Sequence, residues 1–81
     1  MTKTNFGMFT DEGNYMVARI ATAGATLATA DGAETAWRFA QRELSKLATA
    51  DGFGEATDTA VREEVYDVVV SAAEDRTNFY S

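Results

Sequence analysis

Residues 11–30 carry apolar side chains around more than half of the circumference when they are wound as a helix at about 100° per residue. One stripe consists of Met16, Ile20, Ala23 and Leu27. Beside it lie the smaller residues Val17, Ala21, Gly24, Ala25 and Ala28. A helix that is apolar on so many sides has to be covered by more than one neighbour, and small residues let those neighbours come close. The pattern predicts a central helix, with Met16, Ile20 and Leu27 in the core, and two further helices packed against it.

Two later segments also repeat apolar residues at helical spacing. In residues 33–50 the predicted core face consists of Ala33, Trp37, Ala40, Leu44, Leu47 and Ala48. In residues 58–76 it consists of Val61, Val65, Val68, Val69 and Ala72. The run of β-branched residues at 65–70 favours a strand by propensity alone, but the helical spacing continues on both sides of it and favours a helix. We therefore predict an all-α fold, a small up-down-up three-helix bundle with helices at about 11–30, 33–50 and 58–76.

The start of the first helix leaves two interpretations open. Thr10 is a good N-cap, and Asp11 and Glu12 suit the positive end of a helix dipole. The alternative is a β-hairpin over Phe6–Ala18 that turns at residues 11–14. We favour the helix, preceded by an N-terminal arm at residues 1–9. At the helix ends, Gly32 and Gly52 each follow an aspartate and are expected to act as stop signals.

Aromatic residues outside the helices are expected to close the two ends of the bundle, because a core this small benefits from additional buried area. Phe6 and Phe9 of the arm are predicted to share one end with Phe53 from the connection at 51–57. Trp37 is predicted to share the other end with Phe79 and Tyr80 of the C-terminal tail, residues 77–81.

Composition excludes several classes of chemistry. The 81 residues fit one domain and include neither Cys nor His, which removes disulfides, thiolate nucleophiles, common zinc sites and serine-hydrolase triads. The formal net charge of −6 disfavours direct binding to nucleic acid or to an anionic membrane. The N-terminal residues are polar and lack the apolar core of a signal peptide. We expect a soluble cytoplasmic protein without a cofactor.

The connection at 51–57 offers the nearest approach to a ligand site. Its Gly-Phe-Gly sequence before a helix faintly resembles a phosphate cradle, but Asp51, Glu55 and Asp58 would repel an anion, and no lysine stands where a Walker loop would place it. The same three acids lack the alternating spacing of a calcium loop. We interpret the segment as a plain flexible connection and predict no catalytic, cofactor-binding or metal-binding residues.

Charged residues form two rows on the predicted helices. A basic stripe consists of Arg38, Arg42 and Lys46, and an acidic face consists of Glu63, Asp67 and Glu74. Like charges one turn apart are mildly unfavourable within a helix, so we expect the basic stripe to pair with the acids of the third helix, including Glu64, either within the chain or within an oligomer. Paired carboxylates can act as acid and base in a cleft, but a solvated acidic face is the favoured interpretation.

Four apolar residues fall outside the predicted three-helix core: Phe39, Tyr66, Val70 and Ala73. A contiguous apolar strip on so small a protein indicates a docking surface. Either a second copy of the chain or the chain's own arm or tail is expected to cover it.

These observations predict a non-enzymatic protein-interaction module that forms a homodimer or a larger homo-oligomer, with another protein as a further partner. The alternative is an acidic decoy that imitates nucleic acid and occupies the groove of a basic nucleic-acid-binding protein. An enzyme that uses carboxylates alone is the least favoured class, because a bundle of this length leaves little room for a pocket.

Overall fold

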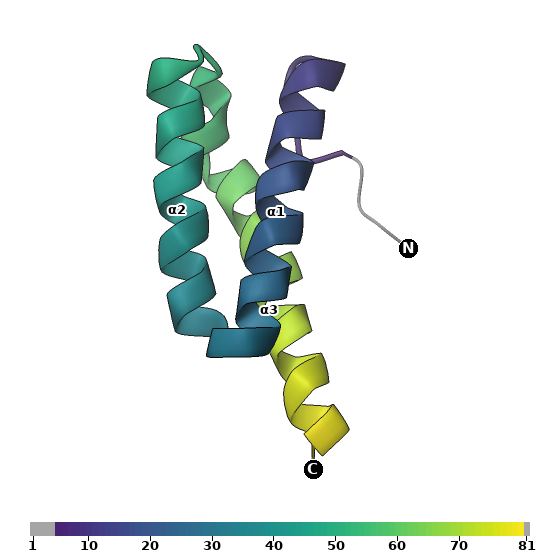
Figure 1. Cartoon of the computed structure of the whole chain (residues 1–81). Coiled ribbons are helices and arrows are strands. Elements are labelled where there is room, and N and C mark those ends of the chain that lie inside the picture. Colours follow the sequence, from purple (N-terminus) through teal and green to yellow (C-terminus); the bar gives the residue numbers. More distant parts are fainter. Residues whose placement is uncertain (1–4, 81) are drawn as a thin grey trace.

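Three helices run alternately up and down in the computed structural model, which describes residues 5–80 and the side chains as far as residue 75 (Figure 1). They are α1 (Asp11–Asp31), α2 (Ala33–Ala50) and α3 (Thr59–Tyr80). A short 3₁₀ helix, η1 (Gly54–Thr57), connects α2 to α3, and there is no strand within residues 5–80. The predicted all-α, up-down-up bundle is confirmed, but α3 continues to Tyr80, so the prediction of a C-terminal tail from residue 77 is wrong.

Local sequence signals determine where the helices begin and end. The Thr10 hydroxyl accepts a hydrogen bond of 3.0 Å from the Gly13 N–H, as expected of an N-cap. The helix therefore starts at Asp11, and the alternative hairpin over Phe6–Ala18 is wrong. Gly32 and Gly52 adopt φ values of 95° and 79°, which L side chains rarely adopt, and end α1 and α2 as predicted.

The connection between α2 and α3 is more ordered than we predicted. Within η1, Ala56 is fully buried and its N–H donates to the Phe53 carbonyl at 2.9 Å. Phe53 is half-buried, and its own N–H donates to the Leu47 carbonyl at 3.2 Å. The interpretation of residues 51–57 as a plain flexible connection is wrong, because these hydrogen bonds and the burial of Ala56 fix the segment against the bundle.

Helix α1 is central, as predicted, and contacts α2 and α3 more extensively than these two contact each other. At Gly24, a Cβ atom would lie only 3.0 Å from Cγ2 of Val69 on α3 and 3.8 Å from Cβ of Ala40 on α2. A side chain here would crowd Val69 and would be in ordinary contact with Ala40. The small residues of α1 therefore permit the close packing that the sequence predicted.

The stripe of α1 that forms the core is not the one we expected. The buried positions are Val17, Ala21, Gly24 and Ala28. Met16, Ile20 and Leu27 are only half-buried, and Ala23 is exposed. The prediction that chose the larger side chains was wrong because α1 lies close to two helices at once, and only small residues fit between the backbones.

The other two helices follow their predicted patterns more closely. On α3, Val61, Val65 and Val69 of the predicted core face are fully buried, and its other two members, Val68 and Ala72, are half-buried against the core. The buried residues of α2 are Ala36, Ala40, Leu44 and Leu47. Ala33, Trp37 and Ala48 of the predicted core face are half-buried, whereas Ala36, which we did not predict, is fully buried. The Trp37 indole lies against Tyr66 of α3.

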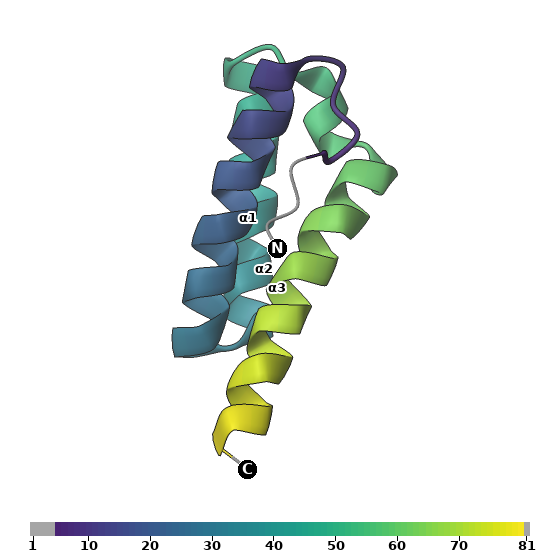
Figure 2. The same ribbon diagram turned by 90° about the vertical axis from the view of Figure 1, so that its right-hand side faces the viewer.

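The N-terminal arm crosses from the first turn of α1 toward α3 (Figure 2). It buries Phe6 and Met8, with 2% and 7% of their surfaces exposed, whereas Phe9 is 84% exposed. Phe6 is therefore buried, as expected of a residue that closes the core, and the prediction for Phe9 is wrong. The predicted position of Phe79 and Tyr80 against Trp37 lies outside the described side chains.

Asn14 holds the arm in place. Its Oδ1 accepts hydrogen bonds from the backbone N–H groups of Phe6, at 2.9 Å, and Met8, at 3.2 Å. Its Nδ2 donates to the carbonyls of Met8, at 3.4 Å, and Thr10, at 3.2 Å. One side chain in the first turns of α1 thus satisfies the backbone of an arm that has no regular secondary structure.

Candidate functional site

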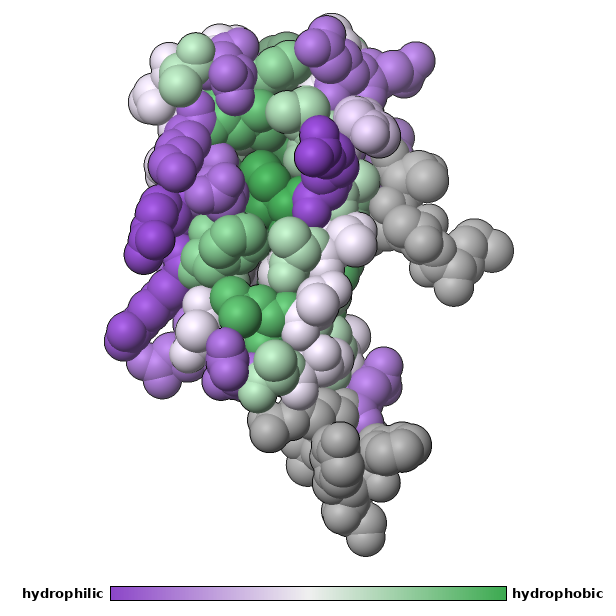
Figure 3. Space-filling model, in the orientation of Figure 1, coloured by the Kyte–Doolittle hydropathy of each residue, from purple (hydrophilic) through white to green (hydrophobic). Residues whose placement is uncertain are grey.

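A shallow apolar groove runs between α1 and α2, where Figure 3 shows hydrophobic surface along the junction of the two helices. Its apolar lining consists of Met16, Ile20 and Ala23 from α1, and Phe39 and Leu47 from α2. Leu47 belongs to the core, Ala23 is exposed, and the other three are half-buried. Three of the large apolar side chains that the core leaves out, Met16, Ile20 and Phe39, therefore gather at this groove.

The position of this groove follows from the helical wheel. Met16, Ile20 and Ala23 recur at intervals of four and three residues, directly beside the small stripe that α1 presents to the core. Phe39 is three residues beyond buried Ala36, on the side of α2 that faces α1. We missed the α1 residues of this surface because their size had placed them in the core. The available signal was that α1 carries two adjacent apolar stripes.

Charged side chains of both signs border the α1–α2 groove. They are Arg19, Glu43, Lys46 and Asp51. Lys46 Nζ lies 3.4 Å from a carboxylate oxygen of Glu43, and Arg19 stacks over the ring of exposed Tyr15, with 5.9 Å between the guanidinium carbon and the ring centre. Two positive and two negative residues make this border neutral, although the chain as a whole carries a charge of −6.

The four residues predicted to form one apolar strip are divided between two sides of α2. Tyr66 of α3 is 45% exposed, and its ring packs edge to face on Trp37, with ring centres 5.1 Å apart and planes at 79°. Trp37 and Phe39 are two residues apart on α2, about 200° around the helix. Val70 and Ala73 are half-buried on α3. The structure therefore brings Phe39 together with α1 and does not bring it together with Tyr66.

The basic stripe Arg38, Arg42 and Lys46 lies exposed on α2, but its ion pairs are not those we predicted. Arg38 donates to Glu34 at 2.7 Å, one turn earlier on the same helix, and Lys46 pairs with Glu43. The expected pairing of Arg38 and Lys46 with the acids of α3 is therefore wrong within one chain. A Glu placed four residues before an Arg already offers a local partner.

The predicted acidic residues Glu63, Asp67 and Glu74 are exposed on α3. Glu63 borders the side of α3 that carries Tyr66 and faces Trp37. Asp67 instead borders a second groove, between α3 and α1. The acidic face therefore spans both sides of the exposed surface of α3.

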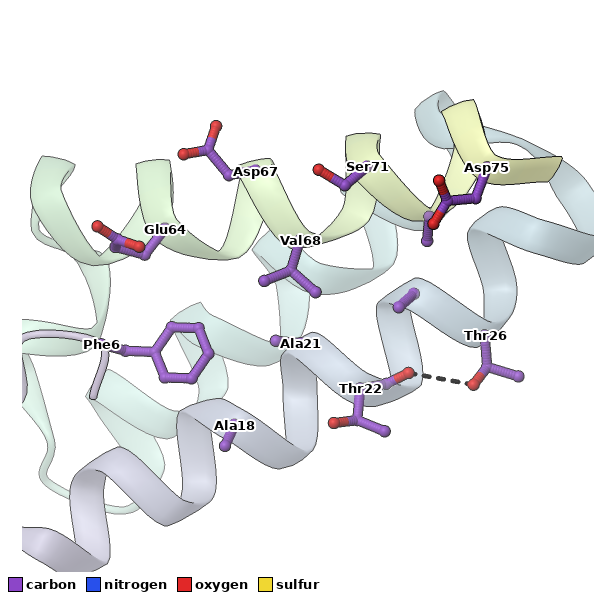
Figure 4. A pocket seen from close by; sticks show the side chains of 12 residues that line it. Phe6, Ala18, Ala21, Thr22, Thr26, Glu64, Asp67, Val68, Ser71 and Asp75 are labelled. Carbon is purple, nitrogen blue, oxygen red and sulfur yellow. Dashed lines mark hydrogen bonds between the residues drawn. The ribbon is translucent and has the colours of Figure 1, made fainter. Parts of the chain in front are cut away.

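The α1–α3 groove has a volume of about 470 Å³ and is the larger of the two. Its apolar lining consists of Phe6, Ala18, Ala21, Ala25, Val68 and Ala72. Its polar lining consists of Thr22, Thr26, Glu64, Asp67, Ser71 and Asp75. Figure 4 shows the Phe6 ring between the two helices at one end, Val68 pointing toward α1, and Asp75 at the opposite end.

Neither a metal-binding cluster nor a membrane-spanning helix is found in the part of the chain that the structure describes. No three acidic side chains there lie close enough together to hold a metal ion. None of the helices there is long and apolar enough to cross a membrane. Comparisons with models of protein families, with curated proteins and with solved structures found no match.

Proposed function

We propose that this protein is a non-enzymatic interaction module that forms homo-oligomers through its α1–α2 groove. The observation that carries the proposal is the placement of Met16, Ile20 and Phe39, which are half-buried around this groove although the chain has few large apolar residues. A sequence that keeps such side chains outside a small core gains stability when another surface covers them. The absence of Cys and His supports a role other than catalysis.

A second copy of the chain is the occupant that best fits this groove. In a twofold dimer each apolar residue of the groove is buried twice, once in each protomer, so a modest strip yields a substantial interface. Burial contributes about 25 cal/mol for each Å² of apolar surface. This contribution adds to the narrow stability margin of a small domain.

Charge favours self-association on this face over the others. Two copies of a chain with a charge of −6 repel each other, and the repulsion is smallest where the contacting surfaces are neutral. The border of the α1–α2 groove carries two bases, Arg19 and Lys46, and two acids, Glu43 and Asp51. A twofold axis can place opposite charges of this border against one another. The acidic α1–α3 groove would meet like charge instead.

Sedimentation equilibrium over a range of concentrations tests the proposal with two neighbouring substitutions. Ala23→Glu places a charged side chain at an exposed position in the α1–α2 groove, where it leaves the core intact. Thr22→Glu adds the same charge to the adjacent exposed residue, which lines the opposite groove. We expect the wild type and Thr22→Glu to associate as concentration rises, and Ala23→Glu to remain monomeric with an unchanged circular dichroism spectrum.

A further variant, Ala23→Arg, tests whether the bulk of the new side chain or its negative charge blocks association. We expect it to block association as Ala23→Glu does, because both side chains fill the same apolar surface. A wild type that stays monomeric at high concentration would overturn the proposal. An oligomer that persists equally in all three variants would overturn the assignment to the α1–α2 groove.

The alternative of an acidic decoy for a basic nucleic-acid-binding protein has one supporting observation, the exposed carboxylates of Glu63, Asp67 and Glu74 on α3. The exposed basic stripe on α2 interrupts the negative surface, so this function ranks second. A decoy would displace DNA from a basic DNA-binding protein at low ionic strength and fail to do so at high ionic strength. Lack of displacement at low ionic strength would exclude it.

A further inference from the structure

The α1–α3 groove differs in character from the α1–α2 groove. One wall is α3, where Asp67, Ser71 and Asp75 follow one another at intervals of four residues and therefore form a straight polar row. The other wall is α1, where Thr22 and Thr26 are uncharged. No Lys or Arg is present among the described residues that line this groove. A ligand in it would meet negative charge on one side only.

The floor of the groove is apolar and made of small side chains. Ala18, Ala21 and Ala25 on α1 oppose Val68 and Ala72 on α3. Because alanine projects little from a helix, this floor leaves room for the side chains of an incoming partner. From Ala18 to Thr26 the groove follows α1 for eight residues, or about 12 Å at 1.5 Å per residue. It therefore accommodates about two turns of a partner's helix lying along α1 and α3.

We propose that this groove binds an amphipathic helix of another protein whose apolar stripe is flanked by lysine or arginine. The apolar stripe would lie on the alanine and valine floor, and the basic flank would lie along Asp67 and Asp75. This binding mode is the one by which helices commonly dock into apolar grooves, and charge complementarity decides the partner and its orientation. The inference adds a second partner to the proposed self-association and uses the opposite side of α1.

Other occupants fit the groove less well. A second copy would bring one acidic row against another, and nucleic acid would be repelled by it. A single metal ion would be poorly held, because Asp67 and Asp75 are two turns apart on α3, a separation of about 12 Å along the axis. A basic helix satisfies both aspartates at once because its own charges repeat at the same helical spacing.

Fluorescence anisotropy with a defined peptide tests the proposal. The probe is a labelled synthetic peptide of about 18 residues, or five helical turns, with leucine on one face and lysine on both flanks. One control peptide has the same composition in scrambled order and lacks an apolar face. A second control has glutamate in place of lysine. We expect the full-length protein to bind the probe in preference to both controls, with an affinity that falls as salt is added.

Matched protein variants locate the binding. Asp67→Asn combined with Asp75→Asn removes two charges from the groove, and Glu63→Gln combined with Glu74→Gln removes two charges from the same helix outside it. We expect the first pair to weaken binding about fivefold, as the loss of two exposed ion pairs implies, and the second pair to change it less than about twofold. Thr22→Lys, at an exposed position in the groove, should weaken binding at least about tenfold by repelling the basic flank.

Three results would overturn the proposal. Equal weakening by both pairs of variants would mean that the probe follows overall charge and not the groove. Equal binding of the scrambled peptide would mean that no apolar stripe is recognised. The third result would show that the chain's own N-terminal segment competes with the peptide for the groove. If Lys3→Gln raised the affinity for the peptide by more than about tenfold, that segment would be the natural occupant. Ala23→Glu, which targets the other groove, should bind the probe as the wild type does, and this separates the inference from the proposed self-association.

Discussion

Replacing Asn14 with alanine removes the side chain that holds the N-terminal arm on the bundle. The variant loses the acceptor for the backbone N–H groups of Phe6 and Met8, at 2.9 and 3.2 Å, and the two bonds that Nδ2 donates, at 3.4 and 3.2 Å. Phe6, which is 2% exposed, depends on the arm for its burial. The substitution therefore acts on the core through a polar residue at its edge.

The size of the effect follows from these contacts. Each of the two hydrogen bonds that Oδ1 accepts contributes about 1 kcal/mol net, so their loss costs about 2 kcal/mol. Alanine is the better helix former by about 0.5 kcal/mol, which offsets part of the loss. Weakened burial of Phe6 increases the loss of stability, since full exposure of such a side chain would cost about 2 kcal/mol by itself. We expect Asn14→Ala to lower the free energy of unfolding by about 2 kcal/mol.

Urea denaturation followed by circular dichroism measures this loss, and hydrogen exchange of the Phe6 and Met8 amides reports the arm directly. Both amides should be protected in the wild type and exchange much faster in the variant. Thr29→Ala is the matched control, because the exposed Thr29 hydroxyl donates only to the Thr26 carbonyl on the same helix, at 2.7 Å. We expect the control to change stability by less than about 0.5 kcal/mol. An equally small change for Asn14→Ala, with unaltered amide protection, would refute the reasoning.

Three further substitutions test the packing. Gly24→Ala should destabilise the protein by about 1 kcal/mol in thermal unfolding, because crowding against Val69 Cγ2 at 3.0 Å outweighs the gain in helix propensity; a more stable variant would contradict this. Tyr66→Ala should cost about 1 kcal/mol and shift Trp37 fluorescence to longer wavelength, because it removes the edge-to-face contact at 5.1 Å; unchanged emission would count against that contact. Arg38→Ala should change stability by less than about 0.5 kcal/mol, because its ion pair at 2.7 Å is exposed; a loss above 1 kcal/mol would show a wider role.

The order and type of the helices could be predicted from the sequence because several signals agree. Helical spacing of the valines on α3 outweighed their preference for strands, and the structure buries Val61, Val65 and Val69. Thr10 and the two glycines after aspartate mark the ends of helices, since each supplies a hydrogen bond or a backbone conformation that a helix end requires.

The choice of core face on α1 could not be settled by periodicity. Two apolar stripes lie side by side, and the spacing is helical for both. Size favoured Met16 and Ile20, whereas the structure buries Ala21 and Gly24 because two helices approach α1 closely. Which stripe faces inward depends on the distance between helices, and this distance is a property of the assembled bundle. The α1–α2 groove was missed for the same reason.

Three other features differ in how far the sequence could have revealed them. The pairing of Arg38 with Glu34 was available from the spacing of four residues alone. The burial of Met8 in place of Phe9 was not, because the arm bends at Gly7, where φ is 89°, and follows no regular alternation. The four hydrogen bonds of Asn14 were not, because they require the path of an arm without regular structure.

The most direct test of self-association through the α1–α2 groove is the solvent accessibility of the Met16 and Ile20 side-chain methyl groups as a function of protein concentration. Paramagnetic relaxation caused by an inert soluble probe measures this accessibility in solution by NMR. The account predicts that relaxation of both methyl groups falls as the protein is concentrated, while that of the exposed Thr22 methyl on the opposite groove stays constant. Equal relaxation of Met16 and Ile20 at low and high concentration would contradict it.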